Sequence, residues 1–174
     1  MIGPEDVTGP AAVDKVLGRV VITLRGVRCD ADGASGTRVA HAMLPCPKVC
    51  PPDTSIAQAR ALFADDHVHA LLVVAGDTLL AVVERADLAG VPADTPARSC
   101  GRLRERVVGP HEDLSVTSRA MVANGRRRLA VVDSGGSLLG LLCLKRSGRG
   151  FCSQADVDAR EHERSAMRAG IAGL

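Results

Sequence analysis

The sequence predicts a mixed helix-and-strand fold in which one small unit occurs twice. Residues 52–74 match residues 110–132 without a gap, and residues 78–83 then match residues 137–142. Each copy has apolar residues at helical spacing, followed by two short aliphatic runs joined by a glycine-containing turn. Self-similarity of this kind is the sequence signature of repeated structural units. We therefore predict two strand–helix–strand–strand–helix repeats that pack with pseudo-twofold symmetry.

Local patterns support each element of the repeat. A first strand is expected near Val49 and, in the second copy, near Val107. Each helix follows a proline and a group of residues that can cap its first amides. These cap candidates are Asp53, Thr54, Ser55, Glu112, Asp113 and Ser115. The two aliphatic runs are apolar on both faces, which predicts strands covered on both sides. One unit cannot bury such a sheet alone, whereas two copies packed face to face can.

The repeats set the organisation of the chain. The predicted segments are an N-terminal extension over 1–36, a first repeat over 37–91, a second repeat over 97–147 and a tail over 148–174. Prolines between 92 and 96 mark the linker.

The two ends carry their own signals. The run Gly18–Val27 is strand-like, and Asp30–Gly36 is rich in turn residues. Ser153 and Asp156 form a capping-box pattern that predicts a mostly solvated helix as far as about Ala169.

Composition excludes several classes of function. The chain has no Trp, no Tyr and 2 Phe, so it lacks the aromatic platforms that stack single-stranded nucleic acid or cage a quaternary ammonium group. A net charge of +2 predicts neither a nucleic-acid nor a membrane partner. No apolar run approaches the roughly 20 residues of a membrane span, and the N-terminus lacks the layout of a signal peptide. We therefore expect a cytoplasmic protein.

The sequence gives little support for a metal site or a catalytic centre. Cys46 and Cys50, with His41 nearby, could begin a zinc site, but no second close Cys/His pair completes it, and we expect no metal. The 6 cysteines are expected to be thiols in a reducing compartment. His67 and His69 alternate, but two ligands rarely suffice for a metal. No phosphate-loop lysine, no Gly-x-Ser-x-Gly elbow and no matched base and nucleophile are present, so we expect no enzyme activity.

Four segments resemble a tandem pair of cystathionine-β-synthase (CBS) domains, an arrangement called a Bateman module. They are VAHAM (39–43), VCPPDTSIAQARALF (49–63), the run from His69 to Leu88, and RRLAVVDSGGSLLGLL (127–142). The resemblance covers about residues 37–147. It implies an α+β fold in which two repeats form one disc-like unit, and such units commonly pair, so a homodimer is expected. It also implies a regulatory role, with AMP, ADP, ATP or S-adenosylmethionine bound in a cleft between repeats.

In such domains the last strand leads into Gly, two apolar residues, Thr or Ser, two variable residues and Asp. The resemblance implies that the hydroxyl meets a phosphate and that the Asp holds the ribose. The first repeat keeps Asp87 but has Glu84 in place of the hydroxyl, and this carboxylate should repel phosphate unless Arg85 turns inward. The second repeat has Cys143 for the hydroxyl and Arg146 for the Asp. Neither site is complete.

The candidate nucleotide-binding residues therefore fall into two groups, each with a simpler interpretation. Aliphatic residues on which an adenine would rest are Val49, Leu71, Val107 and Leu129, which core packing would also explain. Polar candidates are Glu84, Asp87, Arg128, Cys143 and Arg146. Asp87 could instead stabilise a helix N-terminus, and the basic residues could form a solvated edge.

Charge is divided unequally between the repeats. Residues 39–97 carry 3 basic and 7 acidic side chains, whereas residues 98–150 carry 11 basic and 4 acidic ones. Three interpretations compete. The acidic repeat faces the basic one, within the module or across a head-to-tail dimer; the basic repeat binds a polyanion; or the charge is a solvated surface without a role.

Our leading hypothesis is a non-enzymatic regulatory or sensing protein that dimerises and binds an adenosine-containing nucleotide, with no required cofactor. The alternative is a ligand-free adaptor that docks an unidentified protein partner. A nucleic-acid binder is a third hypothesis, which the missing aromatic platforms disfavour.

Overall fold

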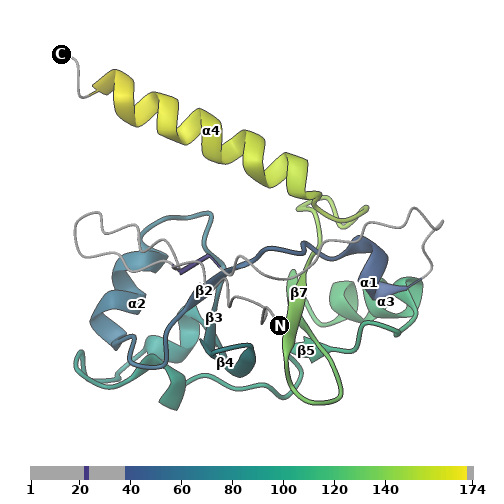
Figure 1. The fold of residues 1–174 in the computed structure, drawn as a ribbon, viewed down its shortest axis with the longest axis horizontal. Coiled ribbons are helices and arrows are strands. Elements are labelled where there is room, and N and C mark those ends of the chain that lie inside the picture. The colour runs from purple at the N-terminus through teal and green to yellow at the C-terminus, as the bar shows by residue number, and fades with distance from the viewer. Residues whose placement is uncertain (1–21, 24–37, 172–174) are drawn as a thin grey trace, which may run out of the picture.

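The computed structural model describes residues 22–23 and 38–171, and it contains two small sheets with helices at both ends of the molecule (Figure 1). The first sheet has the strand order β1-β2-β3-β4 and the second has β5-β6-β7. The strands are β1 (Ile22–Thr23), β2 (Lys48–Cys50), β3 (Ala70–Ala75), β4 (Thr78–Glu84), β5 (Val107–Val108), β6 (Arg128–Val132) and β7 (Leu138–Cys143). The helices are α1 (Val39–Ala42), α2 (Ile56–Phe63), η1 (Arg85–Leu88), η2 (Ala97–Ser99), α3 (Leu114–Ala123) and α4 (Gln154–Ile171).

The predicted repeat is confirmed. In each copy a short strand pairs parallel with the strand after the helix, and that strand pairs antiparallel with the next one. The hairpin of each copy carries a register shift at the same point, between Val73 and Val74 and between Val131 and Val132. The α+β fold predicted from the sequence is therefore the observed one.

The repeats differ after their last strand. β4 runs directly into η1, as predicted, whereas β7 leads into a turn in which Leu144 pairs with Phe151. Between β7 and α4, a stretch that the structure describes throughout, the short final helix expected in the second repeat is absent. The chain folds back on itself there before α4 begins.

The predicted caps are present. Ser55 and Gln58 form a capping box at the start of α2, and the Asp113 carboxylate accepts two backbone amides at the start of α3. The predicted tail helix is confirmed as α4, with Ser153 and Asp156 bonding to each other's backbone amides. The predicted N-terminal strand is described only as β1, which pairs with β2, while Asp30–Gly36 lies outside the described residues.

The strands are buried on both faces, as their apolar character predicted. In β3, Leu71 and Val73 pack toward α2, while Leu72 and Val74 point to the other side. On that side they meet Ala130 and Leu138 of the second repeat. Successive residues of a strand face opposite ways, so a continuous aliphatic run supplies both layers of the core. The helix α3 closes the second repeat with its own cluster around Met121 and Leu142.

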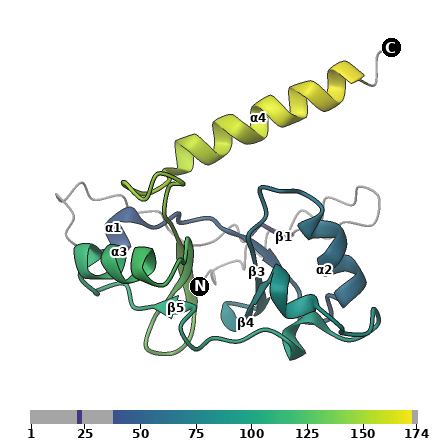
Figure 2. The same ribbon diagram turned by 180° about the vertical axis from the view of Figure 1, so that it is seen from behind.

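The linkers cross from one repeat to the other. Leu44, which lies just ahead of β2, pairs with Leu141 of β7, and Arg102, which lies just ahead of β5, pairs with Val82 of β4. Figures 1 and 2 accordingly show α1 beside α3, at the opposite end of the molecule from α2. Both hairpin turns also meet, since Thr78 pairs with Ser137. The repeats are thus held together by backbone pairing as well as by their shared core.

Each crossing requires a glycine where the two backbones meet. A Cβ atom on Gly140 of β7 would lie 2.6 Å from the Leu44 carbonyl oxygen. At the equivalent crossing the glycine is in the segment ahead of β5, where a Cβ on Gly101 would lie 2.9 Å from the Ala81 Cβ. The close approach explains the small residue at both places.

None of the helices in the described part of the chain combines the length and the apolar character needed to cross a bilayer.

Candidate functional site

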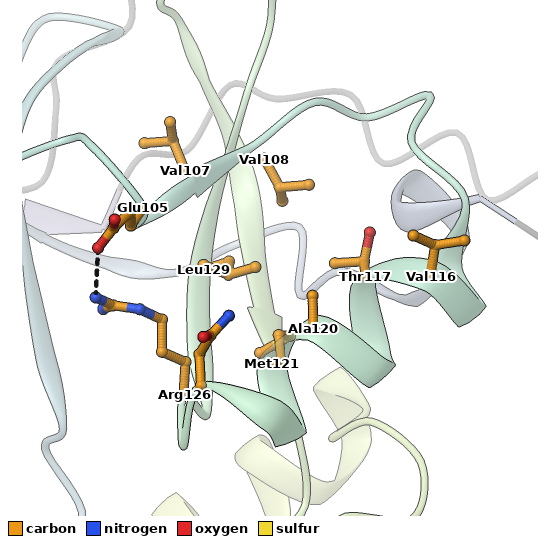
Figure 3. A pocket seen from close by; sticks show the side chains of 10 residues that line it. Glu105, Val107, Val108, Val116, Thr117, Ala120, Met121, Arg126 and Leu129 are labelled. Carbon is orange, nitrogen blue, oxygen red and sulfur yellow. Dashed lines mark hydrogen bonds and ion pairs between the residues drawn. The ribbon is translucent and has the colours of Figure 1, made fainter.

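A pocket with a volume of about 470 Å³ opens in the second repeat, between β5, α3 and the start of β6 (Figure 3). Most of its walls are aliphatic, and polar groups lie at its edges. Its lining residues are Glu105, Val107, Val108, Val116, Thr117, Ala120, Met121, Asn124, Arg126 and Leu129. Figure 3 shows Glu105 and Arg126 paired at one end, next to Val107, with Val116 and Thr117 at the other. A mostly apolar cavity with a few polar groups is the usual form of a small-molecule site.

The backbone at Glu105 shapes this end of the pocket. Glu105 has a φ of 63°, a left-handed conformation that is uncommon outside glycine. Its carboxylate lies 3.4 Å from the Arg126 guanidinium, whereas the next side chain, Arg106, enters the interior. The turn therefore places the Glu105 side chain at the pocket and the Arg106 side chain in the interior.

Beside the pocket lies a set of charged side chains that joins the two repeats, which we call the inter-repeat charge cluster. It contains Glu84 and Asp87 from the first repeat and Arg102, Arg106 and Arg126 from the basic half of the chain. The Glu84 carboxylate lies 3.0 Å from Arg106 and 3.2 Å from Arg126. Arg126 belongs to both features, because it lines the pocket and reaches the cluster.

Arg106 is the centre of the cluster. Only 1% of the residue is exposed, and its guanidinium donates to both carboxylate oxygens of Asp87 and, over 2.8 Å, to the Val82 carbonyl. Its Nε atom has no partner among the described residues. The hydrogen bonds to Asp87 raise the pKa of Arg106, although burial opposes this. A buried charge is tolerated only when it is paired in this way.

Asp87 has two structural tasks. One carboxylate oxygen accepts the Glu84 backbone amide over 2.8 Å, which caps η1, and the carboxylate also pairs with Arg106 and Arg102. Burial alone would raise the pKa of Asp87, but the bonds from Arg106 and from the Glu84 amide outweigh it and lower the pKa. Asp87 therefore stays ionised and fully engaged.

The cluster changes what the sequence implied about Glu84. Its charge is balanced by Arg106 and Arg126, not by the neighbouring Arg85. Arg85 turns away instead, with its guanidinium 5.6 Å from the centre of the Phe63 ring and 3.9 Å from Asp66.

Comparison with known proteins identifies the fold. Residues 39–94 match the family model of the CBS domain. The cystathionine beta-synthase pair domain of SO5017 from Shewanella oneidensis MR-1 superposes with a TM-score of 0.57 at 24% identity, covering 76% of this chain and 75% of that one. CBSX2, solved in complex with AMP, superposes with a TM-score of 0.54 at 25% identity. The match covers 74% of this chain and 99% of that one. The chain is folded as a CBS-domain pair.

A structure of lower sequence identity has a similar fold. The cytosolic domain of the Mg²⁺ channel MgtE, solved in complex with ATP, has a TM-score of 0.52 at 18% identity. That match covers 62% of this chain and 46% of that one, so this CBS-domain pair spans less than half of it. No curated protein sequence matches the chain.

The CBS pair brings only part of the predicted aliphatic group to the pocket. Val107 and Leu129 line it, and both come from the second repeat. Val49 and Leu71 are buried in the core, Val49 between the two sheets and Leu71 under α2. These two positions follow the simpler interpretation, core packing.

The candidates at the end of the second repeat do not form a matching cluster. Cys143 is buried against Cys152, and Arg146 is exposed. Arg128 is half-buried and donates to the Arg127 carbonyl, and burial lowers its pKa. The place that corresponds to Asp87 is occupied by Arg146, so the two ends of the CBS pair are chemically different.

Of the residues that make the site, the sequence singled out Val107, Leu129, Glu84 and Asp87 but not the others. Arg106 and Arg126 were counted only as part of a basic group, and Thr117 and Asn124 were not singled out. The unequal charge of the repeats was the available signal. Its first interpretation, acidic repeat facing basic repeat within one module, is confirmed for the cluster.

The described ranges 22–23 and 38–171 contain no group of three or more His, Cys, Asp or Glu side chains able to hold a metal ion.

Proposed function

We propose that this CBS pair is a regulatory module, without catalytic activity of its own, that binds an adenosine-containing nucleotide in the pocket of the second repeat. The observation that carries the proposal is the position of Arg126, which lines an aliphatic pocket of about 470 Å³ and also reaches the inter-repeat charge cluster. A purine can rest on Val107 and Leu129, and a guanidinium is a strong phosphate ligand. The AMP complex of CBSX2, which has the same fold, supports this choice of ligand class.

The cluster also sets how such a nucleotide would bind. A phosphate near Arg126 competes with Glu84 and Glu105, which lie 3.2 Å and 3.4 Å from that guanidinium. Of the two pairs only the one with Glu84 joins the repeats, so a nucleotide that displaces Glu84 from Arg126 couples binding to the contact between the repeats. We therefore infer that the module reports nucleotide binding as a change in how firmly its repeats are joined.

The test is isothermal titration calorimetry on the full chain with AMP, ADP, ATP and S-adenosylmethionine in turn. We expect saturable heat with at least one of them, and a thermal shift, since a ligand at about 100 times its Kd adds about 2.7 kcal/mol to stability. Ala120→Leu narrows the pocket and should abolish binding. Val122→Leu is the matched control, because Val122 is 55% exposed on the same helix and does not line the pocket. Absence of heat with all four compounds would contradict the proposal.

A second candidate, a ligand-free adaptor, is favoured by one observation. The Asp87 carboxylate already holds three partners, namely Arg106, Arg102 and the Glu84 amide. On this hypothesis the cluster is only a brace between repeats. Asp87→Asn should then lower the melting temperature equally with and without nucleotide, whereas a nucleotide module should show a different loss in the two conditions.

We also propose that two copies of the chain pair as a homodimer. The helix α3 exposes Val116 and Val122, which are 57% and 55% exposed. Sedimentation velocity should give twice the chain mass for the native protein and the single-chain mass for Val122→Glu. A single-chain mass for the native protein would contradict this proposal and leave the nucleotide proposal unaffected.

A further inference from the structure

Two cysteines meet at the base of the C-terminal helix. Cys143 ends β7, and Cys152 lies where the chain returns after the turn. The Cys152 amide donates to the Cys143 carbonyl over 2.8 Å, and the next residues, Leu144 and Phe151, form a bridge. The two Sγ atoms are 2.6 Å apart. The backbone pairing therefore holds two thiols face to face.

The pair packs among apolar side chains, with the charges of Arg127 and Arg128 close enough to act on Cys143. Cys143 is 3% exposed and Cys152 is 6% exposed, and both pack against Leu44, Leu141 and Val157. Within the residues that the structure describes, no third His, Cys, Asp or Glu joins them in a metal-binding group. The geometry thus offers each sulfur one chemical partner, the other sulfur.

We propose that Cys143 and Cys152 are a disulfide-forming pair that fastens the start of α4 to the end of β7. The oxidant is a small disulfide such as glutathione disulfide. One cysteine thiolate attacks it, which forms a mixed disulfide and releases one small thiol. The second cysteine thiolate then displaces the second small thiol. The protein loses two protons and two electrons, and the external disulfide gains them as two thiols.

The bond would matter because α4 is otherwise weakly attached. The ion pairs between α4 and the rest of the described chain join Lys145 to Asp156, Lys48 to Glu161 and Asp65 to Arg164, at 3.7, 2.8 and 3.2 Å. All six side chains are at least partly exposed, and such pairs contribute little and weaken in salt. A bond at Cys152, two residues before α4 begins, would hold the first turn of the helix whatever the ionic strength.

Burial should make the reaction slow in the folded protein. Burial raises the pKa of Cys143 to about 11, so little thiolate exists near neutral pH. The exchange therefore needs a local opening of the turn, and once formed the bond is shielded from reductants. The pair would therefore change its oxidation state after a lasting change in redox conditions but not after a brief one.

Peptide mapping tests the proposal directly. The full chain is equilibrated in glutathione buffers from fully reduced to fully oxidised, alkylated, and cleaved with trypsin without reduction. Lys145, Arg146 and Arg149 lie between the two cysteines, so trypsin separates peptide 129–145 from peptide 150–160 unless a disulfide joins them. We expect the joined peptide in the oxidised sample and its loss in the reduced one. Two separate alkylated peptides under all conditions, or Cys143 bonded to another cysteine, would overturn the proposal.

A second readout links the bond to α4. The oxidised chain should melt about 5–10 °C above the reduced chain, as expected for a short closed loop in a domain of this size. Hydrogen exchange over residues 153–160 should slow at least several-fold on oxidation. Cys152→Ala should remove both effects, while Cys100→Ala, a half-buried thiol that donates to the Ala97 carbonyl, should keep them. If Cys152→Ala fails to fold, the native chain in the two redox states still decides the outcome, and equal melting temperatures would overturn the proposal.

Discussion

The two repeats share a strand–helix–strand–strand topology but differ beyond their last strand. In the first, β4 passes into η1, and Asp87 both caps that helix and holds Arg106. In the second, Arg146 takes the equivalent place and is exposed, and the chain then enters a turn closed by Cys143 and Cys152. The pocket lies in the second repeat, yet the carboxylates that control Arg126 include one from the first.

This contrast teaches that duplication has led to a division of tasks. One repeat supplies negative charge, and the other supplies a cavity and the arginines beside it. The aliphatic core tolerates the buried Arg106 because Glu84, Asp87 and the Val82 carbonyl pair with its guanidinium. Substitutions in either repeat should therefore have unequal effects.

The largest effect is expected at the buried arginine. Arg106→Met leaves the 6%-exposed Asp87 side chain without its main partner, so the free energy of unfolding should fall by about 3–5 kcal/mol. Urea denaturation at neutral pH measures this change. Arg102→Met is the matched control, because Arg102 holds the same carboxylate from a 62%-exposed side chain, and its loss should cost less than about 1 kcal/mol. Equal losses for the two variants would show that Arg106 is not the centre of the cluster.

The next effect compares the two backbone crossings. Gly140→Ala places a Cβ 2.6 Å from a backbone oxygen of Leu44, and Gly101→Ala places one 2.7 Å from a Val83 methyl group. Both should destabilise by about 1–3 kcal/mol, with Gly140→Ala the worse because a backbone oxygen cannot move aside as a side chain can. Gly135→Ala should be nearly neutral, since its nearest contact is the Asp133 carboxylate at 3.3 Å. Chemical denaturation of the three variants ranks them, and a neutral Gly140→Ala would contradict the close crossing.

A smaller effect is expected on nucleotide affinity. Glu84→Thr restores the hydroxyl of the CBS pattern and frees Arg126 from one carboxylate that lies 3.2 Å away. If the proposed function is right, AMP should bind about tenfold more tightly, equivalent to about 1.4 kcal/mol. Calorimetry measures the Kd. Glu112→Thr, an exposed carboxylate outside the pocket, is the control and should leave the affinity unchanged.

The smallest effect is expected on the dependence of stability on pH in the acid range. The folded pKa of Asp87 is lowered, so its contribution to stability is present above the unfolded value of about 3.9 and is lost as the pH falls through the folded value. Asp87→Asn should therefore flatten the fall in stability below about pH 4. Some slope should remain, because a hydrogen bond from the His67 amide also lowers the pKa of Asp65. Melting temperatures between neutral and acidic pH test this, and parallel curves for variant and native protein would contradict it.

Much of the fold could be predicted from the sequence because its causes are local. Continuous aliphatic runs set the strands, and Ser55 and Asp113 cap the helices within three residues of themselves. The missing final helix was not predicted, because the turn that replaces it depends on the pairing of Leu144 with Phe151.

The site was harder to predict because its contacts are distant in the sequence. The segment carrying Arg102, ahead of β5, pairs with β4 and brings Arg106 to Asp87, and no local pattern reports that crossing. The unequal charge of the repeats indicated that the acidic and basic halves could attract each other. It did not indicate which arginine is buried or that another opens onto a pocket.

The two segments that cross between the repeats, around Leu44 and Arg102, determine whether the chain can be divided into two stable fragments. A fragment ending at residue 94, where the family match ends, would lose the backbone bridge from Val82 to Arg102 and every arginine of the cluster. The complementary fragment would lose the Leu44 segment from β7. Each half depends on a backbone segment from the other half, so we expect the two halves to unfold together in one cooperative transition. An ancestor with a single repeat would have needed a second copy of itself to supply the segment that pairs with its last strand.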